Sequence, residues 1–310
     1  MDAGRGRILV IKLGALGDFV QALGPMAAIR RHHPDAPITL LTTSAFESLA
    51  RQCGYFDEVW IDSRPRWHDP CGWLALRKKL NEGGFSRVYD LQNNDRTAFY
   101  LKLFSPRPEW VGAARGASHR NASPGRSAGK AFAGHVQTLA LAGIHDVALD
   151  DLRWMKAAHD FSNLPDPYVL AVIGAAPRHP QKRWPHFGEF CRLLLEHNLT
   201  PVLIGGPDEK KMAQEIISNA PLSIDLTGQT SLSDLPALAV KAAGCIGNDT
   251  GPMHLIAPTG CKSLVLFSGA SKPERHAPLG DHVATLQKEN LEELLPGEVW
   301  GAFKNQLALL

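Results

Sequence analysis

ILVIKLGALGD, residues 8–18, is the segment from which the fold class follows. Ile8–Ile11 is an apolar run without polar alternation, which is typical of a strand buried on both faces of a parallel sheet. Gly14 and Gly17 come directly after it and allow a tight turn and the close approach of a ligand. A helical pattern over residues 20–31 follows. A strand, a glycine turn and a helix in this order predict an α/β protein.

Asp18 ends this turn and has two interpretations. It caps the following helix, or it is a carboxylate displayed at the carboxyl edge of the sheet, where ligands bind in open α/β folds. The segment is not G-x-G-x-x-G, and no acidic residue stands at the end of a suitably spaced second strand, so a nicotinamide dehydrogenase is the weakest candidate. Pro25 predicts that the helix kinks or begins late.

The alternation of strands and helices continues along the chain and then restarts. Further apolar runs in the first half lie at residues 38–41, 59–61, 88–91 and 110–111, with a helical pattern at 73–81. After a proline-marked link at 165–167, similar runs lie at residues 169–173, 202–204, 245–246 and 264–267. The two sets predict two Rossmann-like doubly wound domains that face a cleft, over residues 1–160 and 161–310.

Two segments stand outside this alternation. Residues 114–130 are rich in Gly, Ser, Ala and Arg with almost no large apolar side chain, which predicts a mobile surface loop before a helix at 132–142. Long loops in compact domains are often functional. The tail, residues 290–310, predicts one or two helices, and the last is a candidate for packing back on the N-terminal domain.

The composition is that of a globular cytoplasmic protein. The chain has 310 residues, of which 44% are hydrophobic and 21% charged, and this length suits two domains. No apolar run reaches the roughly 18–20 residues that span a bilayer, and the short polar start is unlike a signal peptide. The five cysteines are scattered, odd in number and without a C-x-x-C pair, which indicates free thiols in a reducing compartment.

Charge is distributed unevenly between the two halves. Residues 1–150 hold 19 Lys and Arg against 14 Asp and Glu, a net +5, and the remaining residues hold 14 against 17, a net −3. The basic half is either a solvated surface or the side that meets an anionic partner such as a phosphorylated glycolipid. It also favours peripheral contact with the inner face of the cytoplasmic membrane, although no amphipathic anchor stands out. Interleaved aromatics and nucleic-acid-binding motifs are missing, so nucleic acid is disfavoured.

NDTGPMH, residues 248–254, follows a strand-like run in the second half. Asp249 or Thr250 can cap the next helix, and Pro252 suits its first turn. The free backbone N–H groups and the helix dipole then form an anion site, to which His254 adds a hydrogen bond or a charge. The alternative is a well-capped helix with a surface histidine.

Two more segments follow strand-like runs of the second half. Gly205 and Gly206 allow a ligand to approach the backbone, and Asp208 or Glu209 either reaches ribose hydroxyls or only starts the next helix. A loop with Lys182 and Arg183 suits a diphosphate, since the charge of a leaving group must be neutralised as its bond breaks. Each signal is weak alone, but together they place a nucleotide site at one edge of the second sheet.

The sequence also predicts catalysis without a metal or another cofactor. No D-x-D sequence occurs, and the 13 histidines form no H-x-H or H-E-x-x-H pair. A divalent ion bridging a diphosphate would therefore lack its usual ligands.

The order of these segments resembles the ADP-heptose:lipopolysaccharide heptosyltransferase family, glycosyltransferase family 9, which has the GT-B fold. NDTGPMH is the most specific match. The matching stretches run through nearly the whole chain in the family's order: LGALGDFVQALGP, KRWP, VLIGGPDE, LTGQTSLSDLPAL, IGNDTGPMHLIA and LFSGASKPERHAPLG. Ser268 and Lys272 depart from the proline-rich or acidic variants common in the family, which weakens the assignment of donor contacts there.

The resemblance implies roles for individual residues. Asp18 takes the place of the general base. Gly17, Arg115 and Arg120 are candidate acceptor contacts in the N-terminal domain. The implied donor-binding residues of the C-terminal domain are Lys182 at the diphosphate, Gly205, one of Asp208 and Glu209 at the ribose, and Asp249, Thr250, Gly251 and His254 at phosphate and sugar.

The implied activity is inverting, metal-independent transfer of a heptose or related sugar. The donor is an ADP-sugar and the acceptor a lipopolysaccharide core or related glycan. Two alternatives remain open: a sugar-nucleotide epimerase of the GT-B fold, for which Asp18 lacks an obvious acid/base partner, and a nucleotide-sugar-binding protein without catalysis.

Overall fold

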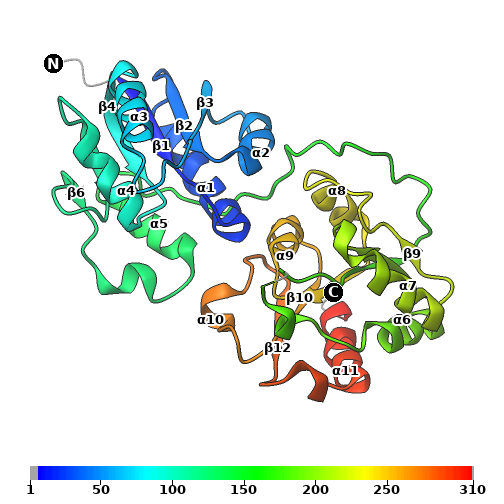
Figure 1. Cartoon of the computed structure of the whole chain (residues 1–310). Coiled ribbons are helices and arrows are strands. Elements are labelled where there is room, and N and C mark those ends of the chain that lie inside the picture. Colours follow the sequence, from blue (N-terminus) through cyan, green and yellow to red (C-terminus); the bar gives the residue numbers. More distant parts are fainter. Residues whose placement is uncertain (1–5, 177, 309–310) are drawn as a thin grey trace. The chain divides into compact units, whose positions relative to one another are not determined.

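A computed structural model describes residues 6–176 and 178–308 of the chain (Figure 1). The chain divides into two compact units, Met1–Asp150 and Asp151–Leu310. Each unit contains one six-stranded sheet in which every pair of neighbouring strands is parallel. The predicted α/β architecture of two Rossmann-like units is confirmed, and the division lies somewhat before the predicted join at residue 160.

The first unit has the strand order β3-β2-β1-β4-β5-β6. Its strands are β1 Arg7–Ile11, β2 Ile38–Thr42, β3 Glu58–Ile61, β4 Phe85–Asp90, β5 Glu109–Gly112 and β6 His119–Arg120. Its helices are α1 Leu16–His32, α2 Glu47–Gln52, α3 Pro70–Glu82, α4 Asp95–Tyr100 and α5 Ala131–Ala140. The strand order reverses between β1 and β4, and such a switch point is where open α/β sheets bind ligands.

The second unit repeats this topology with the order β12-β11-β10-β7-β8-β9. Its strands are β7 Tyr168–Val172, β8 Thr200–Ile204, β9 Ile224–Asp225, β10 Gly244–Asn248, β11 Ser263–Phe267 and β12 Val283–Gln287. Its helices are α6 Phe187–Glu196, α7 Lys210–Asn219, α8 Asp234–Lys241, α9 Gly251–Ile256, α10 Pro273–His276 and α11 Pro296–Leu307. Here the switch point lies between β7 and β10.

The central strands are buried on both faces, as their apolar runs predict. Every residue of β2, β7, β10 and β11 is buried. The last helix, α11, packs on α6 in the second unit, where the rings of Phe190 and Phe303 lie 5.8 Å apart. Packing of this helix on the first unit stays a prediction. Within the described residues, no helix combines the length and the apolar character that a membrane span needs.

Two local predictions were wrong, the late start of α1 and the loop at 114–130, whereas a kink at Pro25 stays a prediction. Helix α1 begins at Leu16 and continues through Pro25, with most of its residues between Phe19 and Ile29 buried. Burial of that stretch outweighs the roughly 3 kcal/mol that an internal proline costs a helix. The predicted loop at 114–130 contains the short strand β6 and a 3₁₀ turn, Pro124–Ser127. Strand β6 forms because it pairs with β5, a contact that local composition does not reveal.

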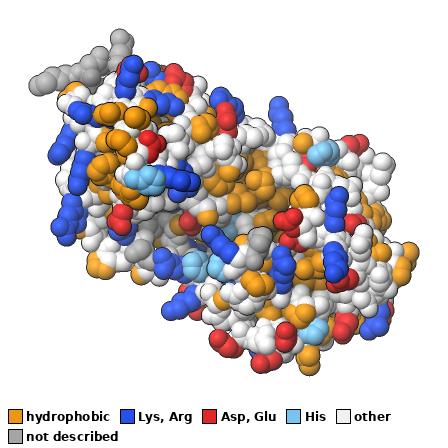
Figure 2. Space-filling view, viewed as in Figure 1, with side chains coloured by type: hydrophobic (Ala, Val, Ile, Leu, Met, Phe, Trp, Pro, Cys, Tyr) orange, Lys and Arg blue, Asp and Glu red, His pale blue; other side chains and the backbone are white. Residues whose placement is uncertain are grey.

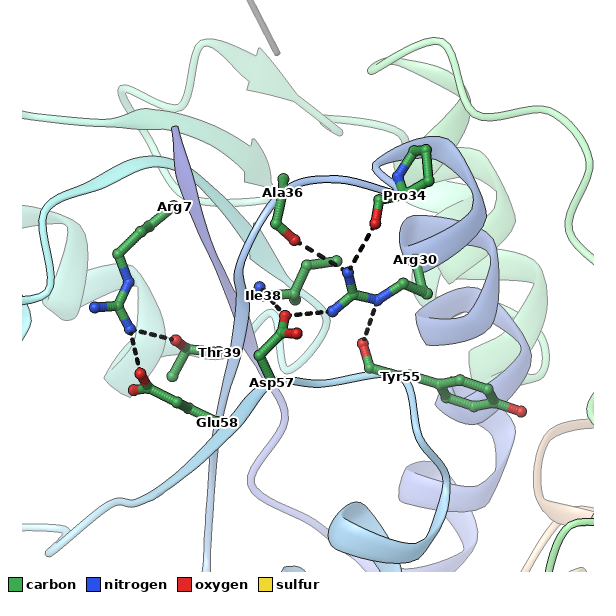
Figure 3. Close-up of polar contacts among 9 residues, drawn as sticks. All are labelled: Arg7, Arg30, Pro34, Ala36, Ile38, Thr39, Tyr55, Asp57 and Glu58. Atoms are coloured by element: carbon green, nitrogen blue, oxygen red, sulfur yellow. Dashed lines mark hydrogen bonds and ion pairs between the residues drawn. The ribbon is translucent and has the colours of Figure 1, made fainter. Parts of the chain in front are cut away.

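Arg30 illustrates how a basic residue of the first half serves the fold (Figure 3). Its guanidinium donates to the carbonyls of Tyr55 at 2.9 Å and Ala36 at 3.0 Å and contacts the Asp57 carboxylate at 2.5 Å. Asp57 in turn accepts a hydrogen bond from the backbone of Ile38 at 2.7 Å. These bonds fix the end of α1 to the starts of β2 and β3, so part of the positive charge of this unit is structural.

Candidate functional site

Asn248 organises the switch point of the second sheet. It is the last residue of β10 and is fully buried. Its side-chain amide donates to the carbonyls of Ile173 at 2.9 Å and Gly174 at 3.2 Å, just after β7, and its oxygen accepts from the backbone of Trp184 at 3.0 Å. One side chain thus joins the ends of two strands and the KRWP loop. Sequence analysis did not single out this role.

Lys182 and Asp249 form an ion pair at the same edge. The distance from Lys182 Nζ to Asp249 Oδ2 is 2.6 Å, and the hydroxyl of Ser271 donates to the same oxygen. The two side chains are only 18% and 8% exposed, respectively. An ammonium held in this shielded position can bind a phosphate more strongly than one in open solvent. The structure therefore brings together two residues that were predicted as donor ligands.

Glu209 forms a second, less buried pair with Arg183. The closest distance between the guanidinium and the carboxylate is 3.3 Å, and the other carboxylate oxygen accepts from the Gly206 backbone at 2.9 Å. Gly205 permits this arrangement, because a Cβ there would lie only 2.9 Å from the Cβ of Glu209. Glu209 is buried, whereas the neighbouring Asp208 is exposed.

A pocket of about 330 Å³ opens beside these pairs. Of the predicted donor residues, Gly205, Asp208, Glu209 and Thr250 line it. Its other walls come from the ends of β7 and β8 and from the start of α8, and its full lining is Val172, Gly174, Ala175, Ala176, Ile204, Gly205, Gly206, Asp208, Glu209, Thr230, Ser231, Leu232, Leu235, Thr250 and Pro252. Lys182, Asp249, Gly251 and His254 are not part of this lining, although Asp249 and Gly251 flank Thr250 in the chain.

Helix α9 differs in detail from its sequence-based prediction. Thr250 is its N-cap residue and Pro252 lies in its first turn, but the Thr250 side chain makes no capping hydrogen bond. The helix has only six residues, so His254 belongs to its last turn. His254 is buried, and the alternative of a surface histidine was wrong. The histidine packs inward because the whole second half of this short helix is buried.

The switch point of the first sheet holds two buried charged residues. Lys12 follows β1 and donates from Nζ to the Leu91 carbonyl at 3.2 Å. Asp90 ends β4, and its Oδ1 accepts from the backbone of Gln92 at 3.1 Å and of Asn93 at 2.9 Å. Its Oδ2 is buried and has no hydrogen-bond partner among the described residues.

Burial shifts the pKa values of both groups toward their neutral forms. Desolvation lowers the pKa of Lys12 to about 8, although the nearby carboxylates of Asp18 and Asp90 oppose the shift. Desolvation likewise raises the pKa of Asp90 to about 6, against the hydrogen bonds that it accepts. Perturbed groups at a strand edge are candidates for function. Neither residue was predicted as part of the site, although Lys12 directly follows the predicted strand at 8–11 and Asp90 lies within the predicted strand at 88–91.

Asp18 is exposed and is the third residue of α1. The N-cap is Ala15, which makes no side-chain bond, so the interpretation of Asp18 as the helix cap was wrong. A carboxylate in the first turn is still favoured by the helix dipole. Gly17 precedes it in the same turn. The turn itself needs Gly14, whose φ is +129° and whose added Cβ would lie 2.9 Å from the Phe46 ring.

A second pocket, of about 460 Å³, lies in the first unit. The predicted acceptor contacts Arg115 and Arg120 line it and Gly17 does not. Its full lining is Trp67, Asp90, Asn93, Asn94, Asp95, Ala98, Phe99, Lys102, Ala113, Ala114, Arg115, Arg120 and Arg126. Four cationic side chains around one pocket can bind an anionic ligand.

Among the described residues, no group of three or more His, Cys, Asp or Glu side chains could hold a metal ion. Metal-independent catalysis stays a prediction, since a metal held by the substrate itself would not need such a group.

Two Rossmann-like units, each with a polar switch point, form the GT-B architecture, which glycosyltransferases share with some sugar-nucleotide epimerases. The sequence profile of glycosyltransferase family 9 (heptosyltransferase) matches residues 73–294. The chain is similar to lipopolysaccharide heptosyltransferase 2 of Escherichia coli, with 30% identity over 88% of this chain and 85% of that protein. The chain therefore belongs to glycosyltransferase family 9 and is a glycosyltransferase.

Solved structures show the same fold. The glycosyl transferase family 9 structure from Veillonella parvula has a TM-score of 0.81 and 20% identity, covering 99% of this chain and 98% of that one. E. coli heptosyltransferase WaaC with ADP-2-deoxy-2-fluoro heptose has a TM-score of 0.73 and 16% identity, covering 96% of this chain and 99% of that one.

Proposed function

We propose that this glycosyltransferase moves a heptose from ADP-heptose to a lipopolysaccharide core or a related glycan, with inversion at the transferred carbon. The E. coli relative is named for lipopolysaccharide heptosyl transfer, and the WaaC structure contains an ADP-heptose analogue. The observation that carries the proposal is the pocket at the β7/β10 switch point with the Lys182–Asp249 pair at the same edge.

The second unit binds the donor in this proposal. Glu209 contacts the ribose, because Arg183 and the Gly206 backbone hold its carboxylate in place at the pocket wall while Asp208 stays exposed. A carboxylate offers about four acceptor positions, so positions remain for two hydroxyls after those bonds. Gly205 leaves room for the nucleoside.

The Lys182 ammonium neutralises the diphosphate as the bond to the sugar breaks. It is held in place by Asp249, which is anchored in turn by Ser271. Transition-state charge is stabilised best by groups that are already in position. The backbone of Thr250 and Gly251 and the side chain of His254 complete the contacts to phosphate and sugar.

The first unit supplies the base and binds the acceptor. Asp18 takes the proton from the acceptor hydroxyl as that oxygen attacks the sugar carbon and the nucleoside diphosphate leaves from the opposite face. Its exposure leaves it accessible to an acceptor, and Lys12 lies close enough to interact with its charge. Arg115 and Arg120 contact anionic groups of the acceptor, while Gly17 leaves space beside the base.

Replacing Asp18 by Asn tests this assignment. Transfer to a deacylated core acceptor should fall by about 10²–10⁴-fold, the usual contribution of a positioned base. Donor binding should persist: ADP-heptose at 100 times its Kd should still stabilise the variant by about 2.7 kcal/mol. Glu47→Gln, which changes a carboxylate in the first turn of α2, is the matched control and should keep full activity.

Three outcomes would contradict the proposal. The first is unchanged transfer by Asp18→Asn. The second is no thermal protection by ADP-heptose when another nucleotide sugar protects. The third is conversion of ADP-heptose in the absence of any acceptor, which is the behaviour of an epimerase. Transfer should also continue in EDTA, and its loss there would overturn the metal-independent mechanism.

A further inference from the structure

Helix α3 and the loop before it carry an exposed apolar surface in the first unit. Trp67 and Leu74 are each 63% exposed, although most large hydrophobic side chains among the described residues are buried. His68 and Pro70 between them are also exposed. We call these four residues the α3 surface.

Trp67 is held in its exposed position by other aromatic rings. It stacks on Trp73 with ring centroids 5.3 Å apart, and Trp73 contacts Phe99 at 5.0 Å. The indole of Trp73 donates to the Arg66 carbonyl at 3.0 Å, which fixes the loop to the helix. Trp67 therefore remains outside a cluster that is already filled.

Leu74 is held outward by the helix itself. The inward face of α3 is occupied by Leu76 and Leu80, which are buried in the core of the first unit. Leu74 is two positions from Leu76, and residues two apart on a helix lie on different faces. Leu74 therefore does not reach the core that buries Leu76. The exposed apolar side chains are thus a feature of the folded unit.

Basic residues flank the α3 surface in the sequence on both sides. Arg64, Arg66, Arg77 and Lys78 are exposed, and the one ion pair found for these four among the described residues joins Lys78 to Glu82 at 3.7 Å. Asp69, the one carboxylate in the sequence between Arg64 and Lys78, caps the helix by accepting a hydrogen bond from the Gly72 backbone. On the visible face of the first unit, hydrophobic and basic side chains lie side by side (Figure 2).

We propose that the α3 surface docks on a bilayer that contains anionic phospholipid. Tryptophan is favoured at the level of the lipid headgroups, and exposed apolar side chains beside it insert at the acyl boundary. The flanking Lys and Arg are attracted to anionic lipid. A protein partner would have to present an acidic surface that matches these four cations, whereas anionic lipid supplies negative charge and an apolar layer together.

The position of the surface adds a second observation. Trp67 also lines the basic pocket of the first unit. Docking there would place the pocket at the membrane surface, where the sugar of a lipid-anchored molecule is accessible. The docking itself does not depend on the donor chemistry proposed above.

Co-sedimentation of the full chain with vesicles tests the proposal. We expect binding to vesicles of 3:1 phosphatidylcholine to phosphatidylglycerol and at least tenfold weaker binding to phosphatidylcholine alone. Trp67→Ala with Leu74→Ala should weaken binding to the anionic vesicles at least tenfold. Arg64→Gln and Arg77→Gln should each weaken it about fivefold, which corresponds to about 1 kcal/mol per basic residue.

Leu222→Ala is the matched control. Leu222 is 75% exposed in the second unit, and its replacement should leave vesicle binding unchanged. Leu74→Gln, an uncharged exposed change on a helix that stays intact, should also weaken binding and keeps the test valid if removal of Trp67 disturbs the aromatic cluster. Equal binding to both vesicle types, undiminished binding by the double variant and by Leu74→Gln, or no binding by the wild type would each overturn the proposal.

Discussion

The two switch points share a strand order but treat charge in opposite ways. In the second unit, the charged residues are paired: Lys182 with Asp249 and Arg183 with Glu209. In the first unit, Lys12 donates to a backbone carbonyl, and one oxygen of Asp90 is buried without a hydrogen-bond partner among the described residues. Within the described residues, Arg183 Nε is also buried without a hydrogen-bond partner, but all four charged groups of the second site have an oppositely charged partner. No ion pair within 4 Å is found for Lys12 or Asp90 in the part of the chain that the structure describes.

This difference separates two kinds of binding surface. Paired charges hold each other in position before a ligand arrives, which suits recognition of a fixed nucleotide. Buried, incompletely satisfied charges cost stability and are retained most often at functional sites. Three substitutions test the contrast.

The largest effect is expected at the buried pair of the second unit. Lys182→Met should lower the free energy of unfolding by about 3–4 kcal/mol, because it leaves the carboxylate of Asp249 buried with only the Ser271 hydroxyl. Urea unfolding measures the change. Lys288→Met is the control, since its pair with Glu298 is exposed and spans 3.7 Å, and it should cost less than about 1 kcal/mol. If both variants lost the same unfolding free energy, the Lys182–Asp249 pair would be no better shielded from solvent than the Lys288–Glu298 pair.

A pH-dependent effect is expected in the first unit. Burial raises the pKa of Asp90 from 3.8 to about 6, so between these values the folded chain binds more protons than the unfolded chain. The contribution of Asp90 to stability therefore falls as the pH rises through this window. Relative to wild type, Asp90→Asn should gain about 2–3 kcal/mol in unfolding free energy between about pH 4 and pH 7.

Urea midpoints at four pH values across this window measure that gain. Asp146→Asn is the control, because the Asp146 side chain is 94% exposed. The unfolding free energy of this variant should differ from that of the wild type by the same amount at every pH. If the difference in unfolding free energy between Asp90→Asn and wild type were also constant across these pH values, the buried carboxylate would be as easily ionised as a solvated one.

A smaller effect is expected at the second ion pair of the second unit, Arg183 with Glu209. Arg183→Met should cost about 1–2 kcal/mol of unfolding free energy, because Glu209 keeps its bond from the Gly206 backbone. It should also weaken ADP binding about tenfold, which equals 1.4 kcal/mol, as measured by titration calorimetry. Arg192→Met breaks a wholly exposed pair on α6 and should change neither quantity. If Arg183→Met bound ADP as tightly as the wild type, the assignment of Glu209 as a donor contact would be contradicted.

The fold was largely predictable because most strands are buried on both faces and so appear as unbroken apolar runs. Strand β12 was missed because its residues are partly exposed, and β6 and β9 because two residues carry no pattern. Pairing with a neighbouring strand defines these elements, and that contact is not local.

The site was predictable where polar or charged residues directly follow a strand-like run in the same segment. Glu209 and Thr250 line the pocket together, and Lys182 pairs with Asp249, as residues grouped at one sheet edge should. Lys12 and Asp90 were missed because their shared burial depends on the pairing of β1 with β4. The bond from Lys12 to Leu91 spans 79 positions in the sequence.

The proposed function depends on binding of the nucleotide by the second unit at its β7/β10 switch point. Hydrogen–deuterium exchange with and without ADP-heptose tests it most directly. We expect slower exchange at residues 205–209, 230–232 and 249–252, around the pocket of the second unit. Protection confined to the first unit, with no change in these three segments, would contradict it.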